Sequence, residues 1–268
     1  MESMELTKFT TLTLEKREGV GIITLNRPEV LNALDFDMSR DLGEAVVRVR
    51  DDEGVRAVIL TGAGRAFCSG GDIKGMLARL SQGASGRREA LKTVYRWLLE
   101  LINLEKPVIA AVNGYAYGAG LSIALAADIL IAAESADFAL SFLKLGLTPD
   151  FAGGYLLPRA IGLNRAKLFT LTADSFGAEM AREFGLVSKV VPDGELPAAA
   201  WQLARRLADG PTRALGLTKI MLNKSLNFNL LDFLELEASY HALSGGTEDF
   251  QEAVKAFGEK RKPEFKGR

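Results

Sequence analysis

Two glycine-rich segments have a residue spacing that suggests chemistry by the peptide backbone. Residues 61–76 read TGAGRAFCSGGDIKGM, and residues 106–129 read KPVIAAVNGYAYGAGLSIALAADI. Each contains or follows an apolar run typical of a buried strand, so the glycines lie where a strand ends. Glycine lets the backbone approach a ligand closely, and free N–H groups at a helix start stabilise a developing negative charge. Two such turns that converge would supply the two N–H donors of an oxyanion hole.

Phosphate-binding loops are competing interpretations of the first segment, and the residues exclude them. A dinucleotide fingerprint would need glycine at positions 62, 64 and 67, and the third position is Phe67. A Walker A loop would need Gly-Lys-Ser/Thr after the glycines, and none follows. Structural turns and close packing of a strand against a helix remain open as explanations of the glycine clusters.

A third segment contributes one carboxylate that could act as an acid or a base. Residues 145–162 read LGLTPDFAGGYLLPRAIG, in which Asp150 follows a proline and precedes an apolar helical stretch. Two interpretations are open for Asp150. It caps a turn or a helix, or it is a general base beside a pocket.

The other reactive side chains form no recognisable constellation. His241 is the only histidine, and we expect a core or interface residue rather than a member of a Ser-His-Asp triad. Cys68 is the only cysteine, and we expect a small buried residue rather than a nucleophile. No cluster of His, Cys and carboxylate residues has the spacing of metal ligands, so the sequence predicts no metal site.

Alternating strands and helices are expected to position these segments. Residues 10–15 and 20–25 read as a strand pair, and residues 35–50 have apolar side chains at helical spacing behind Asp35, a candidate N-cap. Three later apolar runs share a strand-like composition, and a helix-forming segment separates each from the one before: 55–62, 106–114 and 128–135. The repeated order of strand, turn and helix predicts a layered α/β fold.

The chain becomes helical after the connector VVPDGELP. We place a boundary near residue 195, which gives a core of residues 1–195 and a C-terminal helical region of residues 196–268. The last ten residues, EKRKPEFKGR, are basic and are expected to form a partly mobile, solvated tail, with a phosphate contact as the alternative. The expected helices are 197–208, 212–226, 230–243 and 247–258.

Composition limits the possible partners and location. The chain of 268 residues has 33 basic and 34 acidic residues, and this balance gives no general attraction for nucleic acid or an anionic membrane. The most apolar stretch, residues 119–133, is too short to span a bilayer. A single cysteine and a start without the features of a leader peptide predict a soluble cytoplasmic protein.

The motifs together resemble the crotonase superfamily of enoyl-CoA hydratases and isomerases. The resemblance rests on GRAFCSGGDIK and VNGYAYGAGLSIALAADI, and it extends from LNRPEVLNALD to FGEKRKPEF, which is almost the whole chain. It implies a superhelical core of repeated ββα units and a C-terminal helical region that forms homotrimers or hexamers (dimers of trimers). It also implies an acyl-CoA substrate, so that coenzyme A enters as part of the substrate and no cofactor is bound permanently.

The resemblance also transfers roles to single residues. The two oxyanion-hole donors fall on the peptide N–H groups of Gly71 and Ala119. The family commonly has glycine at the second position, and a backbone donor survives the change to alanine. Positions that match the coenzyme A site are Ser69, Gly71 and Ile73, along the adenine and pantetheine path, and Phe257 and Lys260, in a region that often reaches the coenzyme A of a neighbouring subunit.

The two glutamates that hydratases of this family use are absent. Ser122 and Phe142 stand at their positions and are predicted to line the substrate pocket. Adding water needs one group to deprotonate the water and an acid to protonate the α-carbon, and neither side chain does this at neutral pH. Moving a double bond needs only one carboxylate in an apolar pocket and an oxyanion hole to hold the dienolate.

The run TPD…GGYLLPR resembles the phenylacetate-pathway branch of the family, in which an aspartate in this segment serves isomerisation. The sequence therefore predicts an enoyl-CoA isomerase that uses Asp150 as its acid and base. The alternatives are a hydratase-type reaction or a ring-acyl-CoA isomerisation on an unusual substrate, and a catalytically inactive homologue that binds coenzyme A.

Overall fold

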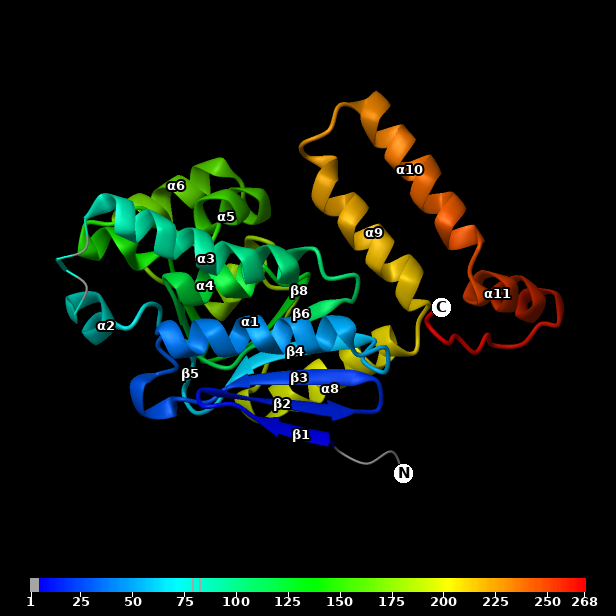
Figure 1. The fold of residues 1–268 in the computed structure, drawn as a ribbon, viewed down its shortest axis with the longest axis horizontal. Coiled ribbons are helices and arrows are strands. Elements are labelled where there is room, and N and C mark those ends of the chain that lie inside the picture. Colours follow the sequence, from blue (N-terminus) through cyan, green and yellow to red (C-terminus); the bar gives the residue numbers. More distant parts are fainter. Residues whose placement is uncertain (1–4, 79, 82) are drawn as a thin grey trace.

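The computed structural model describes residues 5–78, 80–81 and 83–268, and a seven-stranded sheet forms its centre (Figure 1). The strand order is β1-β2-β3-β4-β6-β8-β11. The first three strands pair in antiparallel fashion, and the pairs from β3 onward are parallel. The strands are β1 (Glu5–Lys8), β2 (Leu12–Arg17), β3 (Val20–Leu25), β4 (Ala57–Gly62), β6 (Val108–Val112), β8 (Ile129–Ala133) and β11 (Lys189–Val191).

A smaller four-stranded sheet, of order β10-β9-β7-β5, carries the predicted functional turns. Its strands β5, β7 and β9 each follow a strand of the large sheet, and each precedes a helix. The chain therefore repeats a unit of long strand, short strand and helix, and the predicted crotonase-like fold of ββα repeats is confirmed. The four strands are β5 (Ala66–Cys68), β7 (Tyr115–Tyr117), β9 (Asp137–Ala139) and β10 (Phe176–Gly177).

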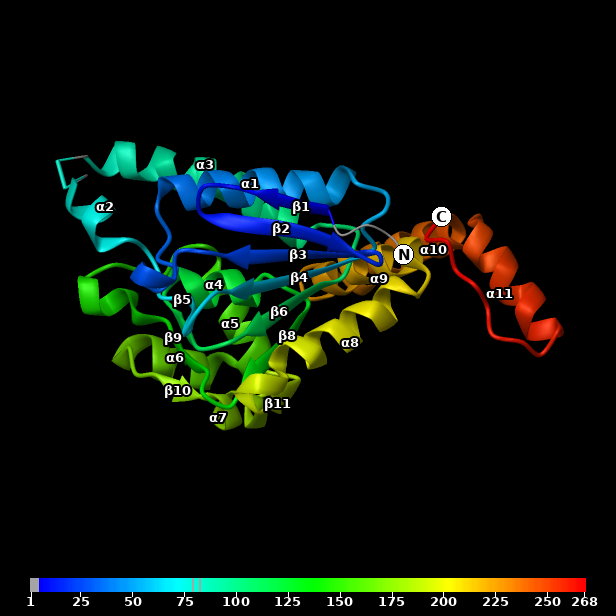
Figure 2. The same cartoon turned by 90° about the horizontal axis from the view of Figure 1, so that it is seen from below.

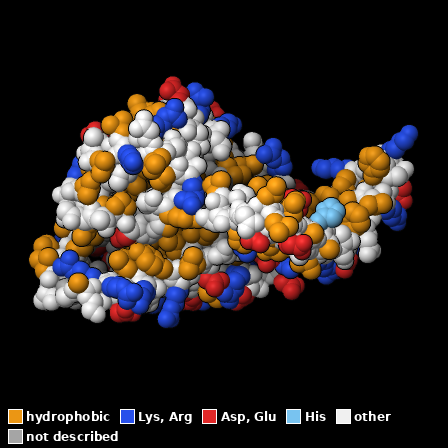
Figure 3. Space-filling view, turned by 90° about the horizontal axis from the view of Figure 1, so that it is seen from above, with side chains coloured by type: hydrophobic (Ala, Val, Ile, Leu, Met, Phe, Trp, Pro, Cys, Tyr) orange, Lys and Arg blue, Asp and Glu red, His pale blue; other side chains and the backbone are white. Residues whose placement is uncertain are grey.

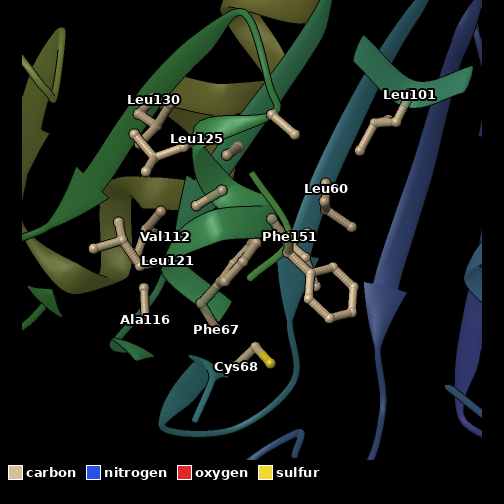
Figure 4. Packing of buried hydrophobic residues seen from close by; sticks show 14 of the residues in the cluster. Leu60, Phe67, Cys68, Leu101, Val112, Ala116, Leu121, Leu125, Leu130 and Phe151 are labelled. Atoms are coloured by element: carbon tan, nitrogen blue, oxygen red, sulfur yellow. The ribbon is translucent and has the colours of Figure 1, made fainter. Parts of the chain in front are cut away.

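Helices cover both faces of the large sheet because its strands alternate their buried side chains between two apolar layers. On β4, Val58 and Leu60 belong to one buried cluster, while Ala57 and Ile59 belong to another. The first cluster contains residues of α1 (Phe36–Asp51), α3 (Ala84–Ile102) and α4 (Ala119–Leu125), and the second contains those of α8 (Leu196–Ala208). Figure 2 shows α1 and α3 on one side of the sheet and α8 on the other. Figure 4 shows the first cluster around Phe67, Leu121 and Phe151.

The remaining helices lie at the periphery. The longest of them, α10, has no buried residue in the single chain. Together with α9 it forms a hairpin that extends away from the large sheet (Figure 1). The peripheral helices are α2 (Ile73–Ala78), α5 (Gly153–Ile161), α6 (Leu163–Thr172), α7 (Ala178–Glu183), α9 (Thr212–Ser225), α10 (Leu230–Gly245), α11 (Glu248–Gly258) and the 3-10 helices η1 (Pro28–Val30), η2 (Ser141–Leu145) and η3 (Asp193–Glu195).

An ion pair of the buried Lys219 fixes α9 to the sheet. Lys219 of α9 lies 2.9 Å from Asp128, whose carboxylate also accepts a hydrogen bond from the N–H of Val108 at 2.7 Å. Burial raises the pKa of Asp128 and lowers the pKa of Lys219, and the charge of each partner opposes the shift. Removing one partner of such a pair leaves a buried charge and is strongly destabilising.

The end of the basic C-terminal tail is hydrogen-bonded to the rest of the chain, which contradicts the expected mobility, whereas most of its residues are exposed, as a solvated tail should be. The buried carboxylate of Asp249 on α11 accepts hydrogen bonds from the N–H groups of Lys266 and Gly267, at 2.6 and 2.8 Å. Arg56, which directly precedes β4, donates to the carbonyl oxygen of Phe265 at 3.0 Å. A charge pattern cannot reveal these contacts because they use backbone atoms of the tail.

The predicted boundary near residue 195 falls directly before α8. This helix packs its alanines at 200, 204 and 208 against the large sheet, whereas α9, α10 and α11 lie outward from it (Figure 1). Division of the chain into two domains stays a prediction.

The helix over residues 35–50 and its N-cap are confirmed, because the carboxylate of Asp35 accepts a hydrogen bond from the N–H of Met38 at 2.8 Å.

The two glycine-rich turns touch through their backbones. A methyl group at Gly120, in α4, would overlap the carbonyl oxygen of Cys68 at the end of β5. A methyl group at Gly70 would lie 3.0 Å from the carbonyl oxygen of Tyr117 at the end of β7. Neither contact leaves space for a side chain, so the close-packing explanation of the glycines holds at these positions.

We expect Gly120→Ala to destabilise the fold because the added methyl group would force β5 and α4 apart. Overpacking of a tight core contact costs about 1–3 kcal/mol and occasionally more. Urea denaturation followed by circular dichroism measures the change. Gly177→Ala is the matched control, since a methyl group there meets no atom within 4 Å, and a stability change of less than about 0.5 kcal/mol is expected. Equal stability of the two variants would contradict the expectation.

Candidate active site

The peptide N–H groups of Gly71 and Ala119 lie on adjoining turns. Ala119 is the first residue of α4, so its N–H has no partner within the helix. Gly71 faces Leu34 in an isolated bridge that uses the atoms of Gly70 and Asp72 instead of the Gly71 N–H. Among the described residues neither N–H donates a hydrogen bond. A methyl group at Gly70 would lie 3.8 Å from the nitrogen of Ala119, so the structure brings the two turns together.

Two asparagines that were not predicted hold the turns in this arrangement. Asn113, which follows β6, donates to the carbonyl oxygens of Gly64 and Ala66 at 2.8 and 3.2 Å. Asn32 is completely buried and donates to the same Ala66 carbonyl at 2.8 Å. The available signal was their place in the motifs, since one lies in LNRPEVLNALD and the other in VNG. Side-chain amides are well suited to this task because each has two N–H donors and an oxygen acceptor.

Asp150 is a half-buried acid, one oxygen atom of which lacks a hydrogen-bond partner among the described residues. It lies between η2 and α5, and its Oδ1 atom is buried and has no hydrogen-bond partner among the described residues. Burial raises the pKa of Asp150 to about 6, and only the N–H of its own residue acts in the opposite direction. The capping interpretation is wrong for α5, because this helix begins after Ala152 and has no side-chain cap. An acid with one oxygen atom kept from water and without a structural partner is a candidate functional group.

Ser122 connects Asp150 to the turn that carries Ala119. Its hydroxyl lies 3.0 Å from the carbonyl oxygen of Asp150 and 3.2 Å from that of Gly118. Ser122 is completely buried, and Phe142 is also buried, with its ring edge 3.8 Å from a methyl position on Gly118. The structure therefore brings both residues to the site together with Ala119 and Asp150. Their role as lining of a substrate pocket stays a prediction.

Aromatic side chains surround the segment around Asp150. Phe151 is buried, and its ring centroid lies 5.9 Å from that of Trp97 on α3. Burial raises the pKa of Tyr95, also on α3, and the negative charge of Asp150 adds to this shift. The wall beside the acid is thus apolar and aromatic, which disfavours a charged carboxylate.

The predicted coenzyme A residues separate into two groups. Ser69, Gly71 and Ile73 follow one another along the loop from β5 into α2, beside Ala119. Figure 3 shows a hollow at the end of the molecule where α2 lies, with hydrophobic side chains along its rim. Phe257 and Lys260 lie at α11, at the opposite end (Figure 1). One chain therefore does not bring all five together.

Met76 was not predicted, although it lies directly against the first donor. A methyl group at Gly71 would overlap the Cε atom of Met76, which belongs to α2. Methionine is flexible and fills irregular space, so its terminal methyl group is easily displaced. The side chain contributes a further apolar surface next to the Gly71 peptide.

The remaining predictions on reactive residues have mixed outcomes. Cys68 is completely buried, and burial raises the pKa of its thiol to about 11, which confirms a small buried residue rather than a nucleophile. His241 is exposed on α10, so the interpretation as a core residue is wrong in the single chain. Within residues 5–78, 80–81 and 83–268, no three His, Cys, Asp or Glu residues are grouped as metal ligands. No helix in these ranges has the length and apolar character needed to cross a membrane.

Comparison with known proteins decides the family. Residues 15–268 match the family model described as enoyl-CoA hydratase/isomerase. The chain belongs to the enoyl-CoA hydratase/isomerase family. The predicted resemblance to the crotonase superfamily is thereby confirmed.

Relatives within this family carry both activities in their names. The chain is 43% identical over 252 residues to the 1,2-epoxyphenylacetyl-CoA isomerase of Escherichia coli, which covers 94% of this chain and 96% of the relative. It is 38% identical to the short-chain-enoyl-CoA hydratase of Clostridium acetobutylicum, over 97% of this chain and all of the relative. A crystal structure of an enoyl-CoA hydratase/isomerase from Cupriavidus metallidurans has a TM-score of 0.92 at 36% identity, and it covers 97% of this chain and 98% of its own.

The raised pKa of Asp150 makes a prediction about stability. Between its ordinary value of 3.8 and about 6, the folded protein holds a proton that the unfolded chain has released, so stability falls as the pH rises through this window. We therefore expect Asp150→Asn to be more stable than the natural protein at pH 7.5, by on the order of 1–3 kcal/mol. The difference in stability should become small near pH 4, where the Asp150 carboxyl of the folded natural protein is protonated and therefore neutral, as the asparagine is.

Urea unfolding across this pH range measures the effect. Asp174→Asn is the matched control because Asp174 is exposed, and its substitution should leave the pH dependence unchanged. A natural protein as stable as Asp150→Asn at pH 7.5 would show that the carboxylate is not held in an unfavourable environment.

Proposed function

We propose that this member of the family is an enoyl-CoA isomerase that moves a double bond by a proton shift on a single carboxylate. The observation that carries the proposal is the half-buried Asp150 carboxyl, whose buried Oδ1 atom has no partner among the described residues. Asp150 is linked through Ser122 to the turn that carries the N–H donor of Ala119. Neither position at which family hydratases have glutamate holds a carboxylate, since they hold Ser122 and Phe142.

The proposed reaction needs no water and no permanently bound cofactor. The carboxylate of Asp150 takes a proton from C2 of a 3-enoyl thioester, and the C–H electron pair moves toward the carbonyl group. The N–H groups of Gly71 and Ala119 hold the resulting oxyanion of the dienolate. Asp150, now protonated, returns the proton to C4, and the electron pair of the former double bond forms the new bond to hydrogen. The product is the conjugated 2-enoyl thioester.

The pKa of Asp150 suits a group that both accepts and returns a proton. With a pKa of about 6 it is mostly ionised at pH 7 and is a stronger base than an ordinary aspartate. An acid of ordinary strength would return the proton well but remove it poorly. The buried, aromatic surroundings that raise the pKa thus support this dual role.

A ring-containing acyl-CoA is the second candidate substrate. The relative from Escherichia coli is named for the isomerisation of 1,2-epoxyphenylacetyl-CoA, and Trp97, Phe151 and Phe142 supply aromatic surface near Asp150. Turnover of linear 3-enoyl-CoA thioesters against cyclic acyl-CoA thioesters separates the two candidates. Incorporation of solvent oxygen into a product from a conjugated enoyl-CoA would instead support a hydratase-type reaction.

We expect Asp150→Asn to lose isomerase activity while keeping its fold. Removal of a general base commonly reduces the rate by about 10²–10⁴-fold. The assay is the rise in absorbance of the conjugated thioester from a 3-enoyl-CoA, and Asp174→Asn serves as the control. In the natural protein, kcat/KM should fall as the pH drops below about 6, because protonated Asp150 cannot accept a proton. Undiminished activity of Asp150→Asn would refute its assignment.

We also propose that the chain assembles as a homotrimer or a hexamer. The exposed leucines of α10 support this, since Leu230, Leu231 and Leu234 are 73%, 70% and 48% exposed in the single chain. Contiguous exposed apolar surface of this kind marks an interaction site. In such an assembly Phe257, which is 87% exposed, and Lys260 would be free to reach the acyl-CoA of a neighbouring chain.

Charged substitutions on this surface should dissociate the assembly into single chains. We expect Leu231→Asp combined with Leu234→Asp to reduce the mass measured by light scattering toward the 29.0 kDa of one chain. Leu171→Asp on α6 is a control of similar exposure, at 69%, and should keep the assembled mass. A natural protein that already sediments as a single chain would contradict the proposed assembly.

A further inference from the structure

The backbone directly after Asp150 has an uncommon conformation. Phe151 and Ala152 have φ angles of 48° and 60°, in the left-handed region that favours glycine. Two such residues in succession do not persist unless their surroundings hold them. The position of the Asp150 carboxyl therefore depends on the contacts that fix this turn.

Several contacts fix the turn, and three of them involve Asp150 and Phe151. The carbonyl oxygen of Asp150 accepts hydrogen bonds from the N–H of Gly153 at 2.9 Å and from the hydroxyl of Ser122 at 3.0 Å. A carbonyl oxygen has two lone pairs, so both bonds form together. The third contact is the packing of the Phe151 ring against Trp97. Of the three, only the bond from Ser122 links the turn to α4.

Ser122 is built closely into this junction. It is completely buried, and a methyl group at Gly153 would overlap its Oγ atom. Its hydroxyl has one proton and donates to one carbonyl at a time, and the carbonyl of Asp150 is nearer than that of Gly118. Ala119, whose N–H has no partner within the described part of the chain, lies one turn earlier in the same helix.

We infer that Ser122 is a positioning residue, which fixes the peptide of Asp150 relative to the N–H donor of Ala119. The inference deepens the proposed function and rests on it, because it assigns a role for the proposed base. Ser122 Oγ lies so close to Gly153 that a methyl group there would overlap it, so this junction leaves little room for a side chain longer than serine at position 122.

Few ionisable groups face the carboxyl of Asp150 from the packed elements. α3 contributes Tyr95, and α4 contributes none in the described chain. Lys144 of η2 is exposed, and Tyr155 of α5 shares a hydrogen bond with Asn227. A titration of Asp150 therefore reports mainly how deeply its carboxyl is buried.

The test is Ser122→Ala, with the Asp150 carboxyl followed by ¹³C NMR in protein labelled at aspartate and assigned by its loss in Asp150→Asn. Releasing the turn should let the carboxyl reach water, and its pKa should fall from about 6 toward 3.8. With a saturating 3-enoyl-CoA we expect kcat to fall about ten- to a hundredfold, because small misplacement of a reacting group is costly. KM should change by less than about threefold, because the N–H donors remain in place.

Ser244→Ala is the matched control, since Ser244 on α10 also donates to the carbonyl four residues earlier but has no link to Asp150. In Ser244→Ala, the titration of the Asp150 carboxyl and the turnover of 3-enoyl-CoA should equal those of the natural protein. If Ser122→Ala does not fold, Ser122→Cys carries the same comparison, because a thiol is a weaker donor of similar shape.

The outcomes separate the inference from the proposed function. An unchanged titration of Asp150 in Ser122→Ala would overturn the positioning role, whatever the activity. A shifted titration in a protein that isomerises no 3-enoyl-CoA or cyclic acyl-CoA would support the role of Ser122 in holding Asp150 and refute the proposed reaction. A drop in stability without any change in titration or kcat would assign Ser122 to the core alone.

Discussion

The close backbone contact between the two glycine turns is the constraint on which the site depends. The carbonyl of Cys68 lies where a side chain at position 120 would be, and Tyr117 and Gly70 approach in the same way. This contact joins the ends of β5 and β7, which belong to different ββα units. Because it is made by main-chain atoms, it determines where the N–H groups of Gly71 and Ala119 lie whatever the neighbouring side chains are. Asn113 and Asn32 then bind the carbonyls of Gly64 and Ala66, which precede this contact in the first turn.

The region around Asp150 differs from the glycine turns, because its carboxyl and its backbone are held in states that reduce the stability of the fold. A carboxyl whose buried oxygen has no partner in the part of the chain that the structure describes reduces stability, and so do two successive residues with positive φ. The surrounding core compensates, through Phe151, Trp97 and the bond from Ser122. Sites that bind or transform a ligand commonly conflict with stability in this way. The fold thus combines a rigid pair of donors with a base whose placement requires continuous restraint.

The sequence predicts the regular elements well where hydrophobic periodicity is long, as in α1 behind Asp35 and in the strand over residues 55–62. It does not predict β5, β7 and β9, because strands of three residues are too short to show a period and lie among glycines. The motifs identify the residues of the two donors, but nothing in them shows the direction of Asp150. The sequence draws attention to Ser122 only because hydratases of the family have a glutamate at this position. Its bond to the Asp150 carbonyl follows from tertiary packing and cannot be predicted from the motif. The tail bound by Asp249 was missed for the same reason.

The single thiol of Cys68 lies at the junction of the two turns and is entirely shielded from solvent. An alkylating reagent therefore reaches it only when β5 and α4 separate. The rate of alkylation therefore measures how often the two turns open, and no probe has to be introduced into the protein. Since the chain has no second cysteine, this signal is free of background from other sites. Protection of the thiol by an acyl-CoA would then reveal how strongly ligand binding and the cohesion of the scaffold are coupled.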